Sequence, residues 1–337
     1  MKNRKKVKSR KNKKASEKKL SFKNILFPVF LIVILPLVNY SDALDRTLMP
    51  QLFALSVFLL VYVSFVYFFF KNPVIRKNRI KNGVFLFTAV YLFFTIVSSF
   101  FAVNFKESLF DITKTSVFLA IVIFTLHQLE EKPRLLSFLP DLFLISGMLL
   151  LAGGYYQYFT LVLPSREDFL PDGRSIVYLV TGFMAHKNLY ASALFMQLPF
   201  LAWGFWMNKG TRRILFGIAV TATLIMLLLL STRAVWMGTL VAGFSMAAVL
   251  ILKSNQFGLP RKFRLYSSVA ILAVIIAGGV FVAANQSSSE FTVADRFRSI
   301  FDPEASNNRY RLNVWEASLE MWKEEPVFGV GSGNWKV

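Results

Sequence analysis

One arginine interrupts a long apolar stretch of the chain. Ser231 to Leu240 reads STRAVWMGTL and lies within about forty largely apolar positions, from Arg213 to Leu252. This stretch is too long for one membrane crossing and suits two, so it predicts a helical hairpin that reverses near Ser231 and Thr232. Arg233 then falls in the first turn of the second helix. Amid lipid its guanidinium would cost about 2.5–3.5 kcal/mol, so we expect it at the membrane surface or in a polar cavity.

The surroundings of Arg233 suit an anion. The amino end of a helix carries free N–H groups and partial positive charge, and a guanidinium presents paired donors that match phosphate oxygens. Trp236 lies on the same helix face, where an indole anchors at the level of the lipid headgroups. The hairpin therefore indicates a phosphate-binding site. Alternatively, Arg233 only anchors the helix, with its side chain extended to the membrane interface, and this explains the same residues.

Three polar residues, His186, Lys187 and Asn188, lie at the start of another expected span. His186 would act as a general base or contact phosphate, or it is only a helix-start histidine in the headgroup zone. Lys187 would pair with phosphate as a point charge or touch lipid headgroups. His127 is expected on the opposite membrane face and is left out of the site.

A second candidate arginine, Arg311, lies in the polar C-terminal stretch. Four apolar residues recur there at helical spacing: Leu312, Trp315, Leu319 and Trp322. With Pro326 just beyond, they predict an amphipathic helix over roughly 309–325, lying on the outer surface or on another helix. Arg311 and Trp315 share one face of it. The following glycine cluster, GVGSGN, comes after no strand, which argues against a dinucleotide or P-loop site.

The composition defines the class of protein. The 337 residues are 55% hydrophobic and include 36 Phe, and apolar runs of spanning length recur along nearly the whole chain. A soluble globular protein is thereby excluded, and an all-α polytopic membrane protein is predicted. The chain has no cysteine, so it has neither a disulfide framework nor a thiolate metal site.

Nine membrane-spanning helices are expected, at about 24–40, 50–70, 83–102, 108–127, 138–160, 188–206, 213–230, 234–252 and 266–284. The loops at one end of these helices are rich in Lys and Arg, whereas the short loops at the other end hold only Arg46, Lys106 and Arg233. Because basic loops stay in the cytoplasm, Arg233 is expected on the external face.

The chain is expected to divide into three parts: a basic disordered cytoplasmic tail at 1–23, a transmembrane helical domain at 24–284 and the start of an external, periplasmic loop at 285–337. Residues 1–20 carry eleven Lys or Arg and one Glu, half of the chain's net charge of +20. Such a tail lies against anionic lipid headgroups and fixes the amino terminus in the cytoplasm. RNA binding is its alternative role, and we expect no nucleic acid partner.

Another external loop is expected at 161–187, and several spans contain helix breakers. The loop includes an apolar patch, Ile176 to Met184, that is too short to span. It would lie in the interface or re-enter a protein-lined cavity. Gly153, Gly154 and Pro199 are expected to kink their helices.

Three stretches, in this order, resemble the O-antigen ligase and O-antigen polymerase superfamily of bacterial membrane glycosyltransferases. GFMAHKNLYASALF, Gly182 to Phe195, is similar to the start of one family span. STRAVWMG, Ser231 to Gly238, resembles the family's Ser-Arg-x-x-Trp hairpin with one residue inserted. Arg311-x-x-x-Trp315 followed by EEPVFGVGSGNW is similar to the segment that opens the large external loop. The resemblance covers about residues 182–337, and before them only the hydropathy matches.

The resemblance implies transfer of a glycan from an undecaprenyl pyrophosphate carrier to an acceptor hydroxyl of lipid A core, a growing glycan or a protein. The reaction would occur at the external face of the bacterial cytoplasmic membrane. Arg233 and Arg311 would be catalytic, with His186 a weaker candidate. Substrate contacts would come from Lys187, Asn188, Trp236 and Trp315. Neither a metal nor another cofactor is expected, since pyrophosphate is already a good leaving group.

The resemblance also implies about twelve spans in a complete chain. The family's general base, a histidine of the external loop, would then follow Val337. Two other classes of function stay open at this point: a transporter of a lipid-linked or anionic substrate, and a non-catalytic polysaccharide-assembly protein. Broken helices are common in transporters, but the spans hold almost no midplane carboxylates and no evident inverted repeat. Nothing in the sequence separates a ligase from a polymerase.

Overall fold

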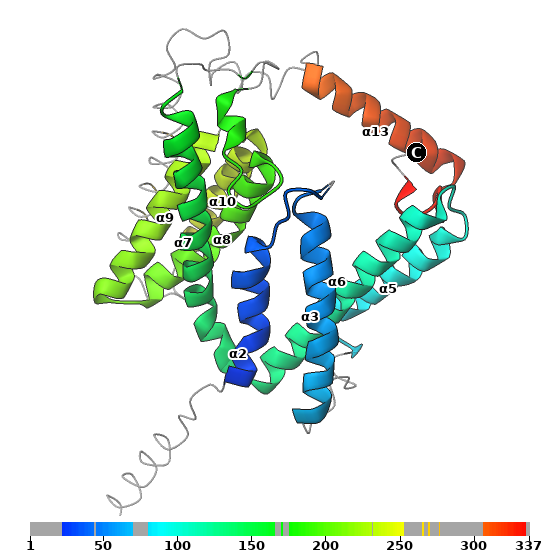
Figure 1. Cartoon of the computed structure of the whole chain (residues 1–337), viewed down its shortest axis with the longest axis horizontal. Coiled ribbons are helices and arrows are strands. Elements are labelled where there is room, and N and C mark those ends of the chain that lie inside the picture. The colour runs from blue at the N-terminus through cyan, green and yellow to red at the C-terminus, as the bar shows by residue number, and fades with distance from the viewer. Residues whose placement is uncertain are drawn as a thin grey trace, which may run out of the picture.

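The computed structural model of the chain describes residues 22–43, 45–69, 80–165, 170, 175–230, 232–252 and 306–334, together with Leu265, Val269 and Ile276. Within these ranges every regular element is a helix (Figure 1). Four stretches are long and apolar enough to cross a membrane: Leu48–Val66, Phe105–Glu131, Pro133–Val162 and Gly210–Leu230. The prediction of an all-α polytopic membrane protein is thus confirmed.

The α-helices are α2 (Phe22–Val29), α3 (Leu48–Phe69), α5 (Gly83–Ser99), α6 (Phe105–Glu131), α7 (Leu139–Gln157), α8 (Lys187–Met207), α9 (Gly210–Leu230), α10 (Arg233–Leu252) and α13 (Ser306–Glu324). Short π or 3-10 elements extend or join them: η1 (Phe30–Ile34), η2 (Leu35–Leu37), η3 (Pro133–Phe138), η4 (Tyr158–Val162) and η5 (Ile176–Leu179). A helix lies at each of the first eight expected spans. The ninth, 266–284, falls outside the described residues apart from Val269 and Ile276, and the expected tail lies outside them up to residue 21.

Short polar side chains define where several helices begin. The Asn82 side chain accepts a hydrogen bond from the backbone N–H of Val84, and Asn104 accepts one from Lys106. The Asp45 carboxylate accepts two, from the backbone N–H groups of Thr47 at 2.9 Å and Leu48 at 2.8 Å. These bonds satisfy N–H groups that lack partners within the helix. The connections before α3, α5 and α6 are therefore fixed locally.

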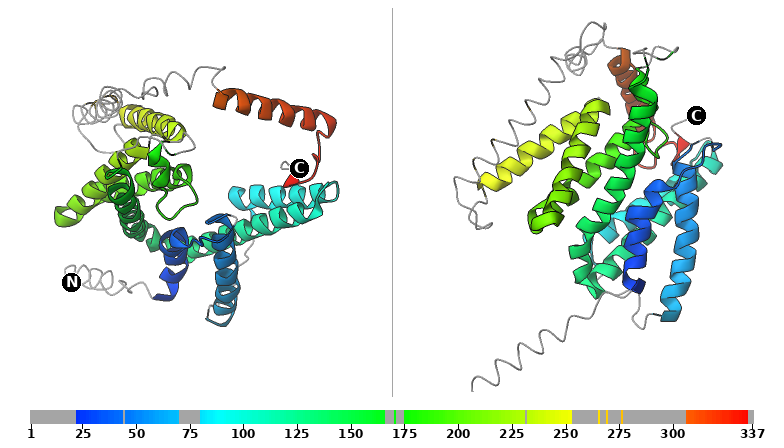
Figure 2. Two further views of the ribbon diagram at one scale, coloured as in Figure 1. Left: turned by 45° about the horizontal axis from the view of Figure 1, so that its top comes forward. Right: turned by 60° about the vertical axis from the view of Figure 1, so that its left-hand side comes forward.

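The described helices pack as two groups. α7, α8 and α9 pack on one another and α10 lies on α8 and α9, while α2, α3 and α6 share a second core around Phe27, Tyr62 and Phe124. α5 pairs with α6 as an antiparallel hairpin that projects to one side (Figures 1 and 2). Large apolar side chains such as Phe53, Phe87 and Phe100 stay exposed along the outside, as expected for surfaces that face lipid.

α7 continues as an α-helix through Gly153 and Gly154 to Gln157, so neither glycine ends the helix. Each glycine instead accommodates an aromatic ring. A Cβ at Gly153 would lie 2.7 Å from the Phe183 ring, and one at Gly154 would lie 2.0 Å from Tyr190 Oη. Small residues at such contacts allow membrane helices to approach closely.

Contacts between loops show which helix ends lie together. Arg212, at the start of α9, forms an ion pair with Asp141, at the start of α7. At the opposite end, the backbone N–H of Ala185 donates to Thr47 Oγ1 at 2.7 Å. The connections that contain Thr47, Ala185 and Thr232, which the charge pattern predicts to share one membrane face, therefore share one end of the molecule (Figure 1).

Candidate functional site

The hairpin around Arg233 forms as predicted. α9 ends at Leu230 and α10 begins at Arg233, and of the two residues between them the structure describes Thr232. The indole of Trp236 folds back on the hairpin, and its Nε1–H donates to the Leu227 carbonyl at 3.1 Å. Thr232 is 6% exposed, and its hydroxyl has no hydrogen-bond partner among the described residues. The turn thus combines a helix N-terminus, a buried hydroxyl and the backbone of Arg233.

The start of α8 lies directly against this turn. Lys187 is only 3% exposed, and its Nζ donates to the Leu230 carbonyl at 3.3 Å. The same ammonium lies 3.8 Å from the centroid of the Tyr178 ring. The Lys187 side chain is therefore held inside the protein, so the expected alternative of a contact with lipid headgroups does not apply. Its charge sits at the carboxyl end of α9, where carbonyl groups favour a cation.

His186 and Asn188 flank Lys187 and are both exposed. His186 precedes α8 in an extended conformation, with φ −156° and ψ 164°, and its side chain makes no capping bond. Its imidazole is thus available at the same end of α8 as the buried ammonium. The structure brings together His186, Lys187, Asn188 and the hairpin, all of which the sequence singles out.

The loop before α8 re-enters the protein. Val180 is fully buried in the core formed by α7, α8 and α9. The Gln157 side chain holds the loop, since its Oε1 accepts from the backbone N–H groups of Thr181 at 2.9 Å and Gly182 at 2.7 Å. Gly182 has φ +57°, and a Cβ there would lie 2.6 Å from the Tyr190 ring. Of the two places expected for this apolar patch, the protein-lined one is therefore correct.

Arg311 and Trp315 lie on α13, where both are exposed. The predicted helix is present, and it begins a few residues earlier than expected. α13 lies beside the tip of the α5–α6 hairpin, whereas α10 packs on the far side of the molecule (Figures 1 and 2). The structure thus does not bring the helix of Arg311 together with the helix of Arg233.

The glycine cluster after α13 also has a defined place. Its residues pack on the turn between α5 and α6, where Phe328 stacks on Phe101 with ring centroids 5.4 Å apart. Sequence reasoning missed this contact, and it missed Gln157 and Asp111 as well. A polar residue within an apolar helix was the available signal for both.

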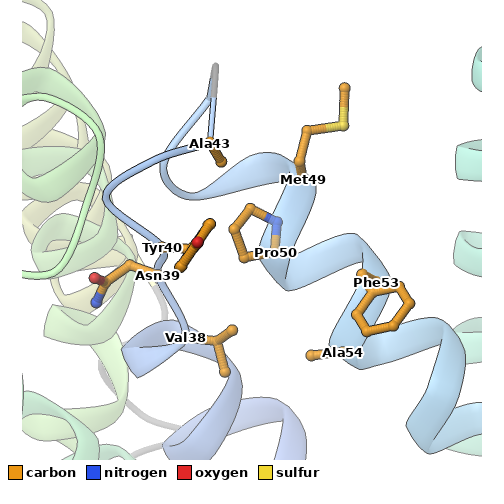
Figure 3. Close-up of a pocket in the computed structure, with 8 residues that line it drawn as sticks. All are labelled: Val38, Asn39, Tyr40, Ala43, Met49, Pro50, Phe53 and Ala54. Atoms are coloured by element: carbon orange, nitrogen blue, oxygen red, sulfur yellow. The ribbon is translucent and has the colours of Figure 1, made fainter.

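An open apolar pocket lies elsewhere, between the loop after η2 and the start of α3 (Figure 3). Its lining residues are Val38, Asn39, Tyr40, Ala43, Met49, Pro50, Phe53 and Ala54. None of the predicted site residues lines it. Among the residues that the structure describes, no group of three or more His, Asp or Glu could hold a metal ion.

Residues 217–337 match the family model described as O-antigen ligase. The match includes Arg233, Trp236, Arg311 and Trp315, but it begins after His186, Lys187 and Asn188. Neither a curated protein nor a solved structure matches the chain. Arg233 lies in the first turn of α10 within the match. Residues 217–337 of this membrane protein are therefore similar to the O-antigen ligase family, and the rest of the chain lies outside the match.

Proposed function

We propose that this protein transfers a glycan from undecaprenyl pyrophosphate to an acceptor hydroxyl at the external face of the bacterial cytoplasmic membrane. The acceptor is a lipid A core, a growing glycan or a protein. The observation that carries the proposal is the family match over residues 217–337, which contains Arg233 at the amino end of α10. In the proposed orientation the tail 1–23 is cytoplasmic, 24–284 forms the membrane domain and 285–337 is external.

The proposed chemistry is displacement of pyrophosphate from the anomeric carbon of the sugar. The acceptor oxygen forms a new bond to that carbon, and the bond from carbon to the phosphate oxygen breaks. Negative charge grows on the leaving pyrophosphate as the bond breaks. Positioned cations in a water-poor site stabilise such charge, and Arg233 is assigned this role. Arg311 lies on α13, apart from α10, and is assigned a contact with the substrate away from the pyrophosphate.

The start of α8 supports the proposal, because it places further polar groups against the hairpin. The buried Lys187 ammonium, 3.3 Å from the Leu230 carbonyl, adds positive charge beside the turn. His186 is exposed at the same helix end and is assigned the removal of the acceptor proton or contact with the phosphates. Asn188, Trp236 and Trp315 are assigned contacts with the lipid-linked substrate.

Replacement of Arg233 tests the proposal. Arg233→Ala should lower transfer at least about a hundredfold, the cost of removing one donor to a developing oxyanion. Transfer is measured in proteoliposomes from glycan-linked undecaprenyl pyrophosphate, and membrane insertion is checked by protease protection. The matched control is Arg213→Ala, since Arg213 belongs to the same hairpin at its other end and lies 4.6 Å from the Phe205 ring. Normal transfer by a correctly inserted Arg233→Ala variant would remove Arg233 from the mechanism.

A further inference from the structure

The segment after α13 is fastened to the membrane helices by a buried polar cluster. We define the glycine segment as Phe328–Asn334 and the α5–α6 turn as Ser98–Asp111. Asn334 is 2% exposed, and its Oδ1 accepts from the backbone N–H of Asn104 at 2.6 Å. Its Nδ2 donates to Ser108 Oγ at 3.0 Å, and Ser108 Oγ in turn donates to the Ser332 carbonyl at 2.5 Å. Asn334 thus bonds both Asn104, the N-cap residue of α6, and Ser108 in the first turn of α6.

A carboxylate within α6 extends this cluster. The Ser332 hydroxyl donates to the Asp111 carboxylate, which also pairs with Lys114 one turn later. Asp111 is 9% exposed near the start of α6, and a buried ionised side chain is costly unless it is paired and hydrogen-bonded. The glycine segment supplies part of that pairing.

Two glycines allow the segment to approach the α5–α6 turn. Gly331 has φ +100°, and a Cβ there would lie 2.4 Å from Ala102 Cα. Gly333 has φ +79°, and a Cβ there would lie 2.8 Å from the Glu107 carbonyl oxygen. Both positions combine a left-handed backbone with contact against another backbone, so a larger residue would break the docking. Gly329 has φ +64° but no atom within 4 Å, so its backbone is left-handed without the close approach.

The docking joins two parts of the chain that are far apart in sequence. The glycine segment lies within the O-antigen ligase match, whereas the α5–α6 turn lies more than a hundred residues before it. α13 ends at Glu324, only a few residues before Phe328, so whatever fixes the segment also fixes that end of α13. Arg311 and Trp315 are carried on the same rigid helix.

We propose that Asn104, Ser108 and Asp111 are positioning residues for glycan transfer. They hold the glycine segment and thereby fix α13, with Arg311, over the membrane helices. This role rests on the proposed function, and it gives the α5–α6 turn a part in the reaction although the turn lies outside the family match. The glycine cluster then acts as a structural anchor.

A disulfide tests the docking itself. The chain has no cysteine, so the paired substitutions Asp111→Cys and Ser332→Cys introduce the only two thiols. Mild oxidation in membranes should join them, because the two native side chains are hydrogen-bonded. A protease site inserted after Ser288 lets a non-reducing gel show whether both fragments stay linked. The matched control pairs Ser332→Cys with Leu109→Cys, since Leu109 is 52% exposed and lies two residues from Asp111 on another face of α6.

Transfer by the same double variant tests the positioning role. In the reduced state this variant lacks the hydroxyl–carboxylate hydrogen bond. Its transfer rate at saturating donor should then fall at least about tenfold, because small displacements of a positioning group are costly. Oxidation should restore the rate, which a loss of folding would not allow. Gly331→Ala should also slow transfer, whereas Gly329→Ala, with a similar backbone conformation in open space, should not.

The possible results separate the two proposals. Failure of the Asp111 and Ser332 cysteines to cross-link, or equal linking of the Leu109 control, would overturn the docking. Equal transfer in the reduced and oxidised states would overturn the positioning role and leave the proposed function intact. If the unaltered protein transfers no glycan, the proposed function fails and the positioning role fails with it, whereas the cross-link still reports on the docking.

Discussion

At the scale of single residues, glycines, which have no side chain, let the membrane helices approach closely. A Cβ at Gly154 of α7 would lie 2.0 Å from Tyr190 Oη, and one at Gly204 of α8 would lie 2.2 Å from the Phe216 ring. Tyr190 and Phe216 are both fully buried, so neither ring has an outward position to move to. Tyr190 is held further by its hydroxyl, which donates to the Leu150 carbonyl at 2.9 Å. The core beneath the candidate site therefore depends on these glycines.

Gly154→Ala should lower the free energy of unfolding by about 1–3 kcal/mol, the usual cost of overpacking a tight core. The effect is measured by denaturant titration of the purified protein in detergent. Gly83→Ala is the control, because a Cβ at Gly83 would meet nothing within 4 Å. Equal stability of the two variants would contradict the packing seen around Tyr190.

The same scale shows what sequence reasoning could supply. The end of α9 at Leu230 and the start of α10 at Arg233 were predictable, because they follow from the length of one apolar run. The roles of Asp111 and Gln157 were not, since their partners come from other parts of the chain. Ser332 is 221 residues away from Asp111, and no local pattern connects the two. The burial of the Lys187 side chain was also unpredictable, because it depends on contacts with Leu230 and Tyr178.

At the scale of elements, α13 presents an apolar face with no cover among the described residues. Trp315 is 62% exposed, Leu319 55% and Trp322 57%. On a helical projection Arg311 borders this face on one side and Lys323 and Glu316 border it on the other, while Glu320 and Glu324 lie opposite. Basic residues beside an apolar, Trp-containing face suit a helix in the plane of the membrane interface. We therefore expect this face to rest on lipid, as the amphipathic pattern predicts.

Cysteine labelling in proteoliposomes checks that expectation. Leu319→Cys should react at least about tenfold more slowly with a water-soluble maleimide than Ala317→Cys, because lipid excludes the reagent. Both positions are exposed in the protein itself, so the protein alone would not produce the difference. Delipidated protein in a short-chain detergent serves as the comparison. Equal rates in liposomes would show that the Trp face does not lie on the membrane.

At the scale of the whole molecule, the helix ends sort into two sets. The Arg212–Asp141 ion pair joins the starts of α9 and α7, and the Ala185–Thr47 hydrogen bond joins two connections at the opposite end. The distribution of Lys and Arg independently predicts that the first set faces the cytoplasm. The first eight helices and the grouping of the described loops were predictable from hydropathy and charge. The position of α13 was not, because it depends on docking at the distant α5–α6 turn.

Labelling in intact cells tests which set faces outward. The unaltered chain contains no cysteine and so gives no background. Arg46→Cys, in the connection before α3, should react with a membrane-impermeant maleimide in intact cells, because the charge pattern predicts that connection to be external. Lys209→Cys, between α8 and α9, should react only after the membrane is permeabilised. The reverse pattern would place Arg233 on the cytoplasmic face, where a lipid-linked glycan presented outside could not reach it, and the proposed transfer reaction would fail with it.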